Sequence, residues 1–374
     1  MVDLKGQYQR YKSEFDLAVQ QVMDEGNFIN GRQVADFSAA LGKWMGSEFV
    51  IPCANGTDAI QLAYMALDLK PGDEIIVPAF NYVAAAEAAV LLGLLPVFAD
   101  VDAQTFNLDP ASARQAIGPK TRAIVAVHLF GQGCNLEELD AICRENNLFL
   151  IEDNAQAIGS AYQGGKFDGK KLGTIGIIGT TSFFPSKNLG CMGDGGAVFC
   201  QDEILAKRVR MMANHGQQVR YQYDAIGINS RLDTLQAAVL GVKLPHLETF
   251  NATRQKAALA YNQSLASVSG IQTPKEASWS THVYHQYTLT CRDAQMRDGI
   301  RQQLQEVGIQ NMIYYPRPLH LHPAYRSERF PEKSLPVSEQ LASQVLSLPI
   351  HSEMTEAMAA EIAAVVAEAV HSFH

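Results

Sequence analysis

The chain has 374 residues, of which 47% are hydrophobic and 18% are charged, so it can bury a large core and form two domains. Its net charge of −9 argues against a nucleic-acid partner, and no local cluster of Lys or Arg reverses that balance. The six cysteines form no CxxC pair, and no apolar run spans or targets a membrane. We therefore expect a cytoplasmic protein with reduced thiols, no zinc site and no other metal site.

Short apolar runs alternate with helical patterns from about residue 50 to 200, which predicts βα units and a mostly parallel sheet. The predicted strands are Glu74–Val77, Pro96–Ala99, Ala123–Val127, Leu148–Ile151, Gly179–Phe183 and Ala197–Cys200. The predicted helices are Thr57–Leu67, Ala84–Leu92, Leu136–Asn146 and Asp202–Ala213, followed by a helical stretch, Arg231–Leu265, that is broken near Pro245.

The remaining residues predict a smaller α+β unit. Its predicted elements are a strand at His282–Cys291, a helix at Ala294–Val307, a strand at Asn311–Tyr315, and helices at Pro336–Leu346 and Thr355–Val370. We expect a large α/β domain at residues 1–250, including an N-terminal helical arm, and a small C-terminal domain at residues 251–374.

Lys187 lies in the run Phe183–Gly196, whose aromatic residues, proline and glycines predict an ordered, partly buried loop. A partly dry site lowers the pKa of a lysine amine and makes the amine a nucleophile toward aldehydes, which is the Schiff-base chemistry of pyridoxal phosphate. A lysine beside glycines is more often part of a surface turn. The interpretation therefore depends on other residues.

Asp153 follows an apolar strand, at the carboxyl end where open α/β sheets bind their ligands. In a pyridoxal phosphate site, such an aspartate keeps the pyridine nitrogen protonated, so that the ring can accept electrons from the substrate. The alternative role is that of a helix N-cap.

Gly56 and Thr57 begin a predicted helix, whose free N–H groups and dipole suit a phosphate. The same pattern is also common at ordinary helix caps. Ser182 ends a predicted strand and could add a hydroxyl to the phosphate, or could bond to the backbone instead.

Aromatic residues occur in two other runs, and the first of them, which contains Tyr82, follows a predicted strand. Tyr82 could lie against a flat cofactor or pack in the core. The run Tyr314–His320 contains two tyrosines, two prolines and a histidine, which suits either a binding loop or a structural one.

Five runs together resemble the sugar aminotransferases of the DegT/DnrJ/EryC1/StrS group, and the resemblance covers nearly the whole chain. These runs are Cys53–Ala59, Ile151–Gln156, Phe183–Lys187, Gly193–Gly196 and Asn229–Gln236. The resemblance implies the aspartate aminotransferase (type I) fold, an α/β fold with a mostly parallel, seven-stranded-type sheet in the large domain and a smaller α+β domain.

The resemblance also implies roles for single residues around pyridoxal 5'-phosphate. Lys187 would form the Schiff base and carry the proton, and Asp153 would pair with the pyridine nitrogen. The other implied contacts are Gln156 to the phenolic oxygen, Tyr82 stacked on the ring, and Gly56, Thr57, Ser182 and Asn229 on the phosphate. Asn229 would come from the other subunit of a homodimer, so that the active sites are composite. Tyr82 stands where other members carry tryptophan or phenylalanine, and Ala85 replaces a common threonine.

The implied reaction is a ping-pong transamination in which L-glutamate gives its amine to the cofactor, and a nucleotide-linked keto-sugar then takes it. The run Lys187–Gly196, with His215–Gln217 and Tyr221, is most similar to enzymes that aminate C3 of UDP-2-acetamido-3-keto-glucuronic acid. Such a product would serve the synthesis of a surface polysaccharide such as lipopolysaccharide, or of another glycan.

Four further residues would contact the substrate. Arg231 could bind a sugar carboxylate with two hydrogen bonds, or could form a salt bridge at a dimer interface. By similarity, Tyr314, Tyr315 and His320 would line the pocket for the sugar and nucleotide.

Two other functions remain open at this point. A pyridoxal-dependent sugar dehydratase of the same family would carry histidine at the position of Lys187. A non-catalytic regulatory member would be expected to lose Lys187 or Asp153, or to add a DNA-binding helix-turn-helix. The sequence does neither, which favours an aminotransferase.

Overall fold

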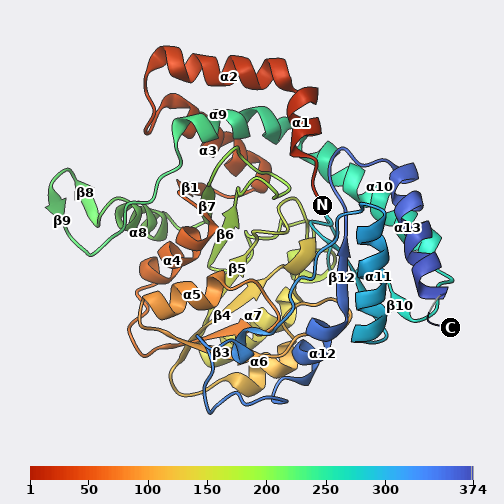
Figure 1. The fold of residues 1–374 in the computed structure, drawn as a ribbon. Coiled ribbons are helices and arrows are strands. Elements are labelled where there is room, and N and C mark those ends of the chain that lie inside the picture. Colours follow the sequence, from red (N-terminus) through yellow and green to blue (C-terminus); the bar gives the residue numbers. More distant parts are fainter. Residues whose placement is uncertain (372, 374) are drawn as a thin grey trace.

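Two β-sheets organise the protein. The computed structural model describes residues 1–371 and 373. Figure 1 shows a central seven-stranded sheet with helices around it, and a three-stranded sheet beside it that carries its own helices.

The central sheet is mostly parallel. In the order in which they pair, its strands are β1 (Phe49–Cys53), β7 (Gly196–Cys200), β6 (Ile178–Ser182), β5 (Phe149–Asp153), β4 (Thr121–Val127), β2 (Glu74–Pro78) and β3 (Leu95–Ala99). Only β7 runs antiparallel to its neighbours, β1 and β6. The carboxyl ends of the parallel strands β5 and β6 therefore meet at one edge of the sheet, where Asp153 and Ser182 are the last strand residues.

Helices cover both faces of this sheet because its strand residues alternate between two cores. Ile75 and Val77 face a core that includes residues of α4 (Gly56–Ala66), α5 (Ala84–Leu91) and α8 (Glu203–Ala213), whereas Ile76 faces the core that contains α6 (Pro110–Ala116) and α7 (Leu136–Asn146). Ala197 and Phe199 of β7 pack instead against α3 and α9. The N-terminal helices and their partner are α1 (Leu4–Arg10), α2 (Lys12–Glu25), α3 (Arg32–Met45) and α9 (Thr234–Lys243).

The C-terminal part has a separate core. Its antiparallel strands are β10 (Ile271–Gln272), β11 (Tyr287–Cys291) and β12 (Val345–Leu348), and its helices are α10 (Leu247–Leu265), α11 (Ala294–Glu306), α12 (Pro336–Gln344) and α13 (Glu356–His371). Helices α10, α11 and α13 pack in this core, whereas Leu341 and Ala342 of α12 belong to the core that contains α4, α5 and α8. The short 3₁₀ helices of the chain are η1 (Leu129–Gly131), η2 (Gly165–Phe167), η3 (Leu244–His246) and η4 (Leu319–Leu321). The predicted domain boundary after residue 250 falls within the first turn of α10 and stays a prediction.

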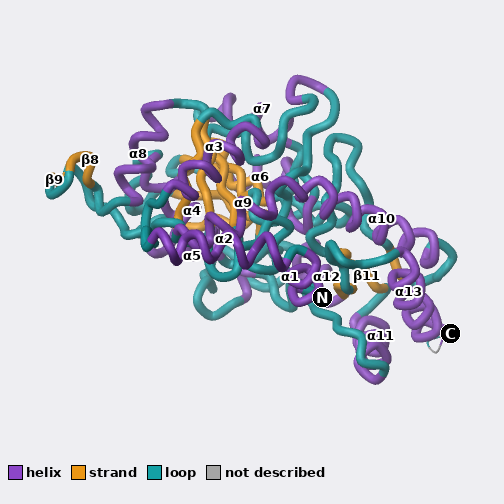
Figure 2. The backbone as a smooth tube through the Cα atoms, turned by 90° about the horizontal axis from the view of Figure 1, so that it is seen from above, coloured by secondary structure: helices purple, strands orange, loops and turns teal. Residues whose placement is uncertain are grey.

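A two-stranded hairpin projects from the body. It consists of β8 (Gln217–Val219) and β9 (Gln222–Tyr223) and follows α8. In Figures 1 and 2 it extends from the end of the molecule opposite α13.

The structure differs from the predicted elements at several places. No strand forms at Asn311–Tyr315, where Met312 makes one isolated bridge to Ser347. The predicted helix Pro336–Leu346 is too long, because the chain becomes strand β12 at Val345. The prediction also lacked strand β1, which contains Pro52. Proline cannot donate to a ladder and is tolerated here because β1 lies at the edge of the sheet.

Asp100, the residue after β3, fixes the start of α12 and so joins the two parts of the protein. Its Oδ1 accepts hydrogen bonds from the N–H of Ser338 at 2.7 Å and from the Ser338 hydroxyl at 2.6 Å, and its Oδ2 accepts one from the N–H of Val337 at 2.9 Å. This buried carboxylate thus caps a helix that lies far from it in the sequence.

We expect Asp100→Ala to lower the free energy of unfolding by about 2–3 kcal/mol, since it leaves buried donors without an acceptor. Urea denaturation measures this. The control is Asp109→Ala, which removes the half-buried cap of α6 and should cost about 1 kcal/mol. Equal losses in the two variants would contradict the role given to Asp100.

Candidate active site

A buried carboxylate and a partly buried amine interact at the end of the central sheet. Asp153 ends β5, and its Oδ1 accepts a hydrogen bond from the N–H of Ala155 at 3.0 Å. Burial raises the pKa of Asp153, while this hydrogen bond and the charge of Lys187 oppose the rise. Burial lowers the pKa of Lys187 to about 8, and the Asp153 charge opposes that shift. The two groups therefore stabilise each other's charged forms.

The loop that carries Lys187 is ordered, as predicted. The N–H of Lys187 donates to the carbonyl of Phe184 at 2.8 Å, and the N–H of Cys191 donates to the carbonyl of Phe183 at 2.8 Å. Phe183 is fully buried and packs edge-on against Phe37 of α3. The lysine is thus held by a loop that is anchored in the core.

Glu152, one residue before Asp153, fixes the end of β5 from the other face of the strand. Its carboxylate accepts hydrogen bonds from His128 Nε2 at 2.9 Å and from the N–H groups of Gly173, Ile175 and Gly176 at 2.7, 2.6 and 2.6 Å. Burial opposes its ionisation, but these donors outweigh burial and lower the pKa of Glu152. The sequence analysis gave Glu152 no role, although a carboxylate inside an apolar strand signals a buried, fully bonded group.

A glycine and a serine meet where α4 begins. A Cβ on Gly56 would lie 2.6 Å from the Cβ of Ser182, so only glycine allows this approach. Asn55 caps the helix by accepting a hydrogen bond from the N–H of Asp58 at 2.8 Å. In the described part of the chain, nothing accepts from the N–H groups of Gly56 and Thr57. The helix start therefore offers free donors beside a hydroxyl, an arrangement that binds anions.

Two aromatic loops meet at Gln156. Its Oε1 accepts from the N–H of Phe130 at 2.8 Å, and its Nε2 donates to the hydroxyl of Tyr315 at 3.2 Å. The ring of Tyr315 lies 6.3 Å from that of Tyr82 and 5.7 Å from that of Tyr314. The side chain of Tyr82 is 56% exposed, so it is not a core residue.

Asn81, next to Tyr82, was missed by the sequence analysis. Its side chain is buried, and neither its Oδ1 nor its Nδ2 has a partner among the described residues. A buried amide with unpaired atoms on both sides is costly, and this marks a place where a further polar group fits. Its only signal in the sequence is its position after a strand.

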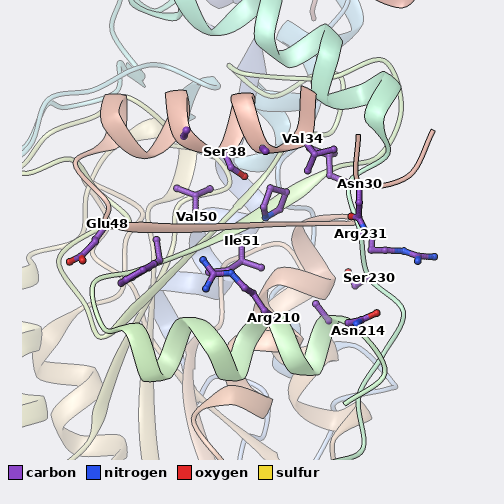
Figure 3. Close-up of a pocket in the computed structure, with 16 residues that line it drawn as sticks. Asn30, Val34, Ser38, Glu48, Val50, Ile51, Arg210, Asn214, Ser230 and Arg231 are labelled. Atoms are coloured by element: carbon purple, nitrogen blue, oxygen red, sulfur yellow. The ribbon is translucent and has the colours of Figure 1, made fainter. Parts of the chain in front are cut away.

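Three predicted site residues remain, namely Asn229, Arg231 and His320. Asn229 is exposed, and Arg231 lines a cavity of about 570 Å³ between α3 and α8, together with Arg210 (Figure 3). Ser230, between them, connects them to the start of α4, because its hydroxyl accepts from the N–H of Ala54 at 3.0 Å. His320 is fully buried and faces Glu339 at 3.1 Å, so it presents no exposed atom to a pocket. Its substrate role stays a prediction.

Residues 1–371 and 373 contain no group of three or more His, Cys, Asp or Glu side chains that could hold a metal ion. Their helices include none with the length and apolar character needed to cross a membrane.

We expect the amine of Lys187 to react with a small aldehyde with a midpoint near pH 8, rather than near the ordinary lysine value of about 10.4, because burial disfavours the ammonium. Borohydride trapping at a series of pH values, followed by peptide mass spectrometry, measures this midpoint in cofactor-free protein. Asp153→Asn should move the midpoint lower, since it removes the charge that stabilises the ammonium. A midpoint near 10 in the unmodified protein would contradict this picture.

Comparison with known proteins identifies the family. The model of the DegT/DnrJ/EryC1/StrS aminotransferase family matches residues 9–367. The chain is 43% identical to the UDP-2-acetamido-2-deoxy-3-oxo-D-glucuronate aminotransferase of Pseudomonas aeruginosa over 94% of each chain. It is 38% identical to the UDP-N-acetyl-3-dehydro-alpha-D-glucosamine 3-aminotransferase of Acidithiobacillus ferrooxidans over 99% of this chain and 98% of the other.

The fold is shared with a solved structure, that of Streptomyces venezuelae DesV in complex with a ketimine intermediate. It has a TM-score of 0.94 and 38% identity, and the match covers 99% of this chain and 97% of DesV. These findings confirm the predicted fold, activity class and cofactor. The chain therefore belongs to the DegT/DnrJ/EryC1/StrS aminotransferase family, whose members are enzymes that depend on pyridoxal phosphate.

Proposed function

We propose that the protein transfers the amine of L-glutamate to a UDP-linked 2-acetamido-3-keto sugar, with UDP-2-acetamido-3-keto-glucuronic acid as the preferred substrate. The product would enter the synthesis of a surface polysaccharide such as lipopolysaccharide. The observation that carries the chemistry is the interaction between the half-buried Lys187 amine and the buried Asp153 carboxylate. The choice of sugar draws on the names of the two relatives, which share the UDP, acetamido and 3-keto features.

The site residues fit pyridoxal phosphate at both ends of the cofactor. The free N–H groups of Gly56 and Thr57, with the Ser182 hydroxyl, provide donors for a phosphate, and the close approach of Gly56 to Ser182 leaves no room for another side chain. Gln156 and the exposed face of Tyr82 would contact the ring. When bound, the cofactor supplies an electron sink for the substrate.

The protein's own groups would hold and move the protons. Asp153, whose charged form the Ala155 N–H and Lys187 stabilise against the effect of burial, would hold a proton on the pyridine nitrogen. The Lys187 amine has a pKa of about 8, close to neutral, so it can take the proton from the amine-bearing carbon of the substrate and return it as a general acid. The burial of Asp153 and the partial burial of Lys187 limit the access of water to this transfer.

We propose that the working form is a homodimer with composite active sites. Asn229 is exposed and would reach the phosphate held by the partner subunit. The hairpin near it exposes apolar side chains that a second copy would cover, namely Val219, Tyr221, Tyr223 and Ile226. Six free, buried thiols suit a reducing cytoplasm, where we propose that the enzyme acts, and we retain the division into domains 1–250 and 251–374.

Arg231 would recognise the carboxylate of the sugar. Within the described chain no carboxylate lies within ion-pair distance of it, so its guanidinium is available to an anion. The names of the two relatives differ at this group, because one substrate is a glucuronate and the other a glucosamine. Tyr314 and Tyr315 would form the wall of the sugar and nucleotide pocket, and His320, whose side chain is fully buried, would support this wall from within the protein.

The alternatives are less favoured. A dehydratase of this family would carry histidine at position 187, and a regulatory member would not need to retain both Lys187 and Asp153. The protein keeps both residues and the pKa shift that makes the amine reactive.

Lys187→Ala should retain noncovalent cofactor but reduce the rate of transamination by about 10²–10⁴-fold or more, since it removes the positioned base. The measurement is the spectral change of the bound cofactor on adding L-glutamate in a stopped-flow instrument. Lys243→Ala is the control, because Lys243 is a buried lysine that also has a lowered pKa but lies in α9. A rate close to that of the unmodified enzyme in Lys187→Ala would refute the role of Lys187.

Arg231→Ala should lower kcat/KM about 10–100-fold for the UDP-linked 3-keto-glucuronate and by threefold or less for the neutral 3-keto-glucosamine analogue, because only the former presents a carboxylate. Arg210→Ala, which changes the other arginine of the same cavity, serves as the control. Equal losses on both sugars would show that Arg231 does not bind the sugar carboxylate.

A further inference from the structure

Asn188, which follows Lys187 in the chain, is buried, and both polar atoms of its side chain have hydrogen-bond partners. Its Nδ2 donates to Asn251 Oδ1 at 2.7 Å and to the carbonyl of Val283 at 3.0 Å, and its Oδ1 lies 3.2 Å from Nδ1 of His285. Asn251 in turn donates from Nδ2 to the carbonyl of Ile158 at 3.1 Å. A continuous chain of hydrogen bonds thus runs from one backbone carbonyl to another past the cofactor lysine.

The two ends of this chain fix the direction of every hydrogen bond in it. The carbonyls of Ile158 and Val283 can only accept, so Asn251 and Asn188 must both turn their NH₂ groups toward them. The Oδ1 of Asn188 is then the atom that faces His285. A hydrogen bond to it requires a proton on Nδ1 of His285, which leaves Nε2 without one while the ring is neutral.

The surroundings of His285 keep the ring neutral. Burial lowers the pKa of His285 well below its usual range, and the charges of Lys187 and Arg254 lower it further. Both charged groups that act on the ring are cations, and Arg254 Nη1 also donates to the His285 carbonyl at 3.4 Å. A Cβ on Gly131 would lie 2.9 Å from the backbone nitrogen of His285, so the two backbones pack closely here.

We propose that Asn188 is a positioning residue that locks His285 as a neutral Nδ1–H tautomer, so that an uncharged ring and not a second cation borders the Lys187 amine. The inference rests on the proposed function, in which Lys187 binds the cofactor and moves the proton.

Two consequences follow for the reaction. Lys187 provides the positive charge that acts on Asp153. Because His285 stays neutral, its charge does not change near neutral pH and does not alter the pKa of Asp153 or Lys187. The same hydrogen bonds attach the residue after Lys187 to α10 and to the segment that leads into β11, so the amine keeps its place relative to the small sheet.

The ring nitrogens of His285 can be observed directly by ¹⁵N NMR of the holoenzyme, with the signal assigned by its loss in His285→Asn. We expect a neutral ring with its proton on Nδ1 from pH 6 to pH 9. A proton on Nε2 of the neutral ring, or a doubly protonated ring at pH 6, would overturn the proposal. This outcome is distinct from failure of the proposed function, which would show as aldehyde trapping at a lysine other than Lys187.

Variants separate positioning from simple packing. In His285→Asn the amide NH₂ can replace the Nδ1–H donor, so kcat should stay within about threefold of the unmodified value. In His285→Gln the amide reaches the place of Nε2 instead, Asn188 loses its donor, and kcat should fall at least tenfold while KM changes by twofold or less. Equal kcat values in the two variants would overturn the proposal.

Asn188→Asp provides a pH readout. Its carboxylate would favour the charged ring, so the ¹⁵N spectrum at pH 6 should show protons on both nitrogens of His285. The matched control is Asn146→Asp, in which the replaced side chain caps only its own helix by donating to Ile142 at 2.8 Å. A His285 ring that stays neutral in Asn188→Asp would contradict the proposal that Asn188 sets its protonation. If the Asn188→Asp variant does not fold, the two His285 variants provide the test.

Discussion

This active site depends on the electrostatic interaction between Asp153 and Lys187 at the carboxyl end of strand β5. Burial of Asp153 and partial burial of Lys187 reduce the stabilisation that water would give to their charged forms, so each charge helps to stabilise the other. Glu152 stabilises the position of Asp153, because its four hydrogen bonds fix the strand that ends in Asp153. The site can thus hold a reactive amine without losing the fold around it.

The same edge of the sheet explains why remote segments converge there. The parallel strands β5 and β6 end together, α4 begins beside them, and the loop of Tyr315 reaches Gln156 from the other part of the chain. Arg231 and Asn229 flank Ser230, whose hydroxyl accepts from the N–H of Ala54 before α4, and Asn229 forms a bridge to Asn214 at the end of α8. The exposure of Asn229 accords with the proposal that the partner subunit completes each site.

Much of the fold was predictable because strand residues alternate or run apolar between turns, as at Glu74–Pro78 and Phe149–Asp153. Strand β1 was not predictable, because Pro52 argues against a strand unless that strand lies at the edge of a sheet, and only the structure shows that β1 does. Lys187, Asp153, Gly56 and Ser182 were predictable from motifs at strand and helix ends. The roles of Glu152 and Asn188 were not predictable, because their hydrogen bonds go to residues that are distant in the sequence, and a local sequence pattern does not indicate such contacts. The burial of His320, which lies against Phe98 and bonds to Glu339, was also not predictable, and its substrate role stays a prediction.

Reduction of the protein with borohydride in the presence of pyridoxal phosphate, followed by peptide mapping, tests the central claim most directly. The account predicts that the cofactor is fixed to the peptide that contains Lys187, and that the reduced protein no longer exchanges an amine with L-glutamate. Attachment to another lysine, with Lys187 unmodified, would contradict it.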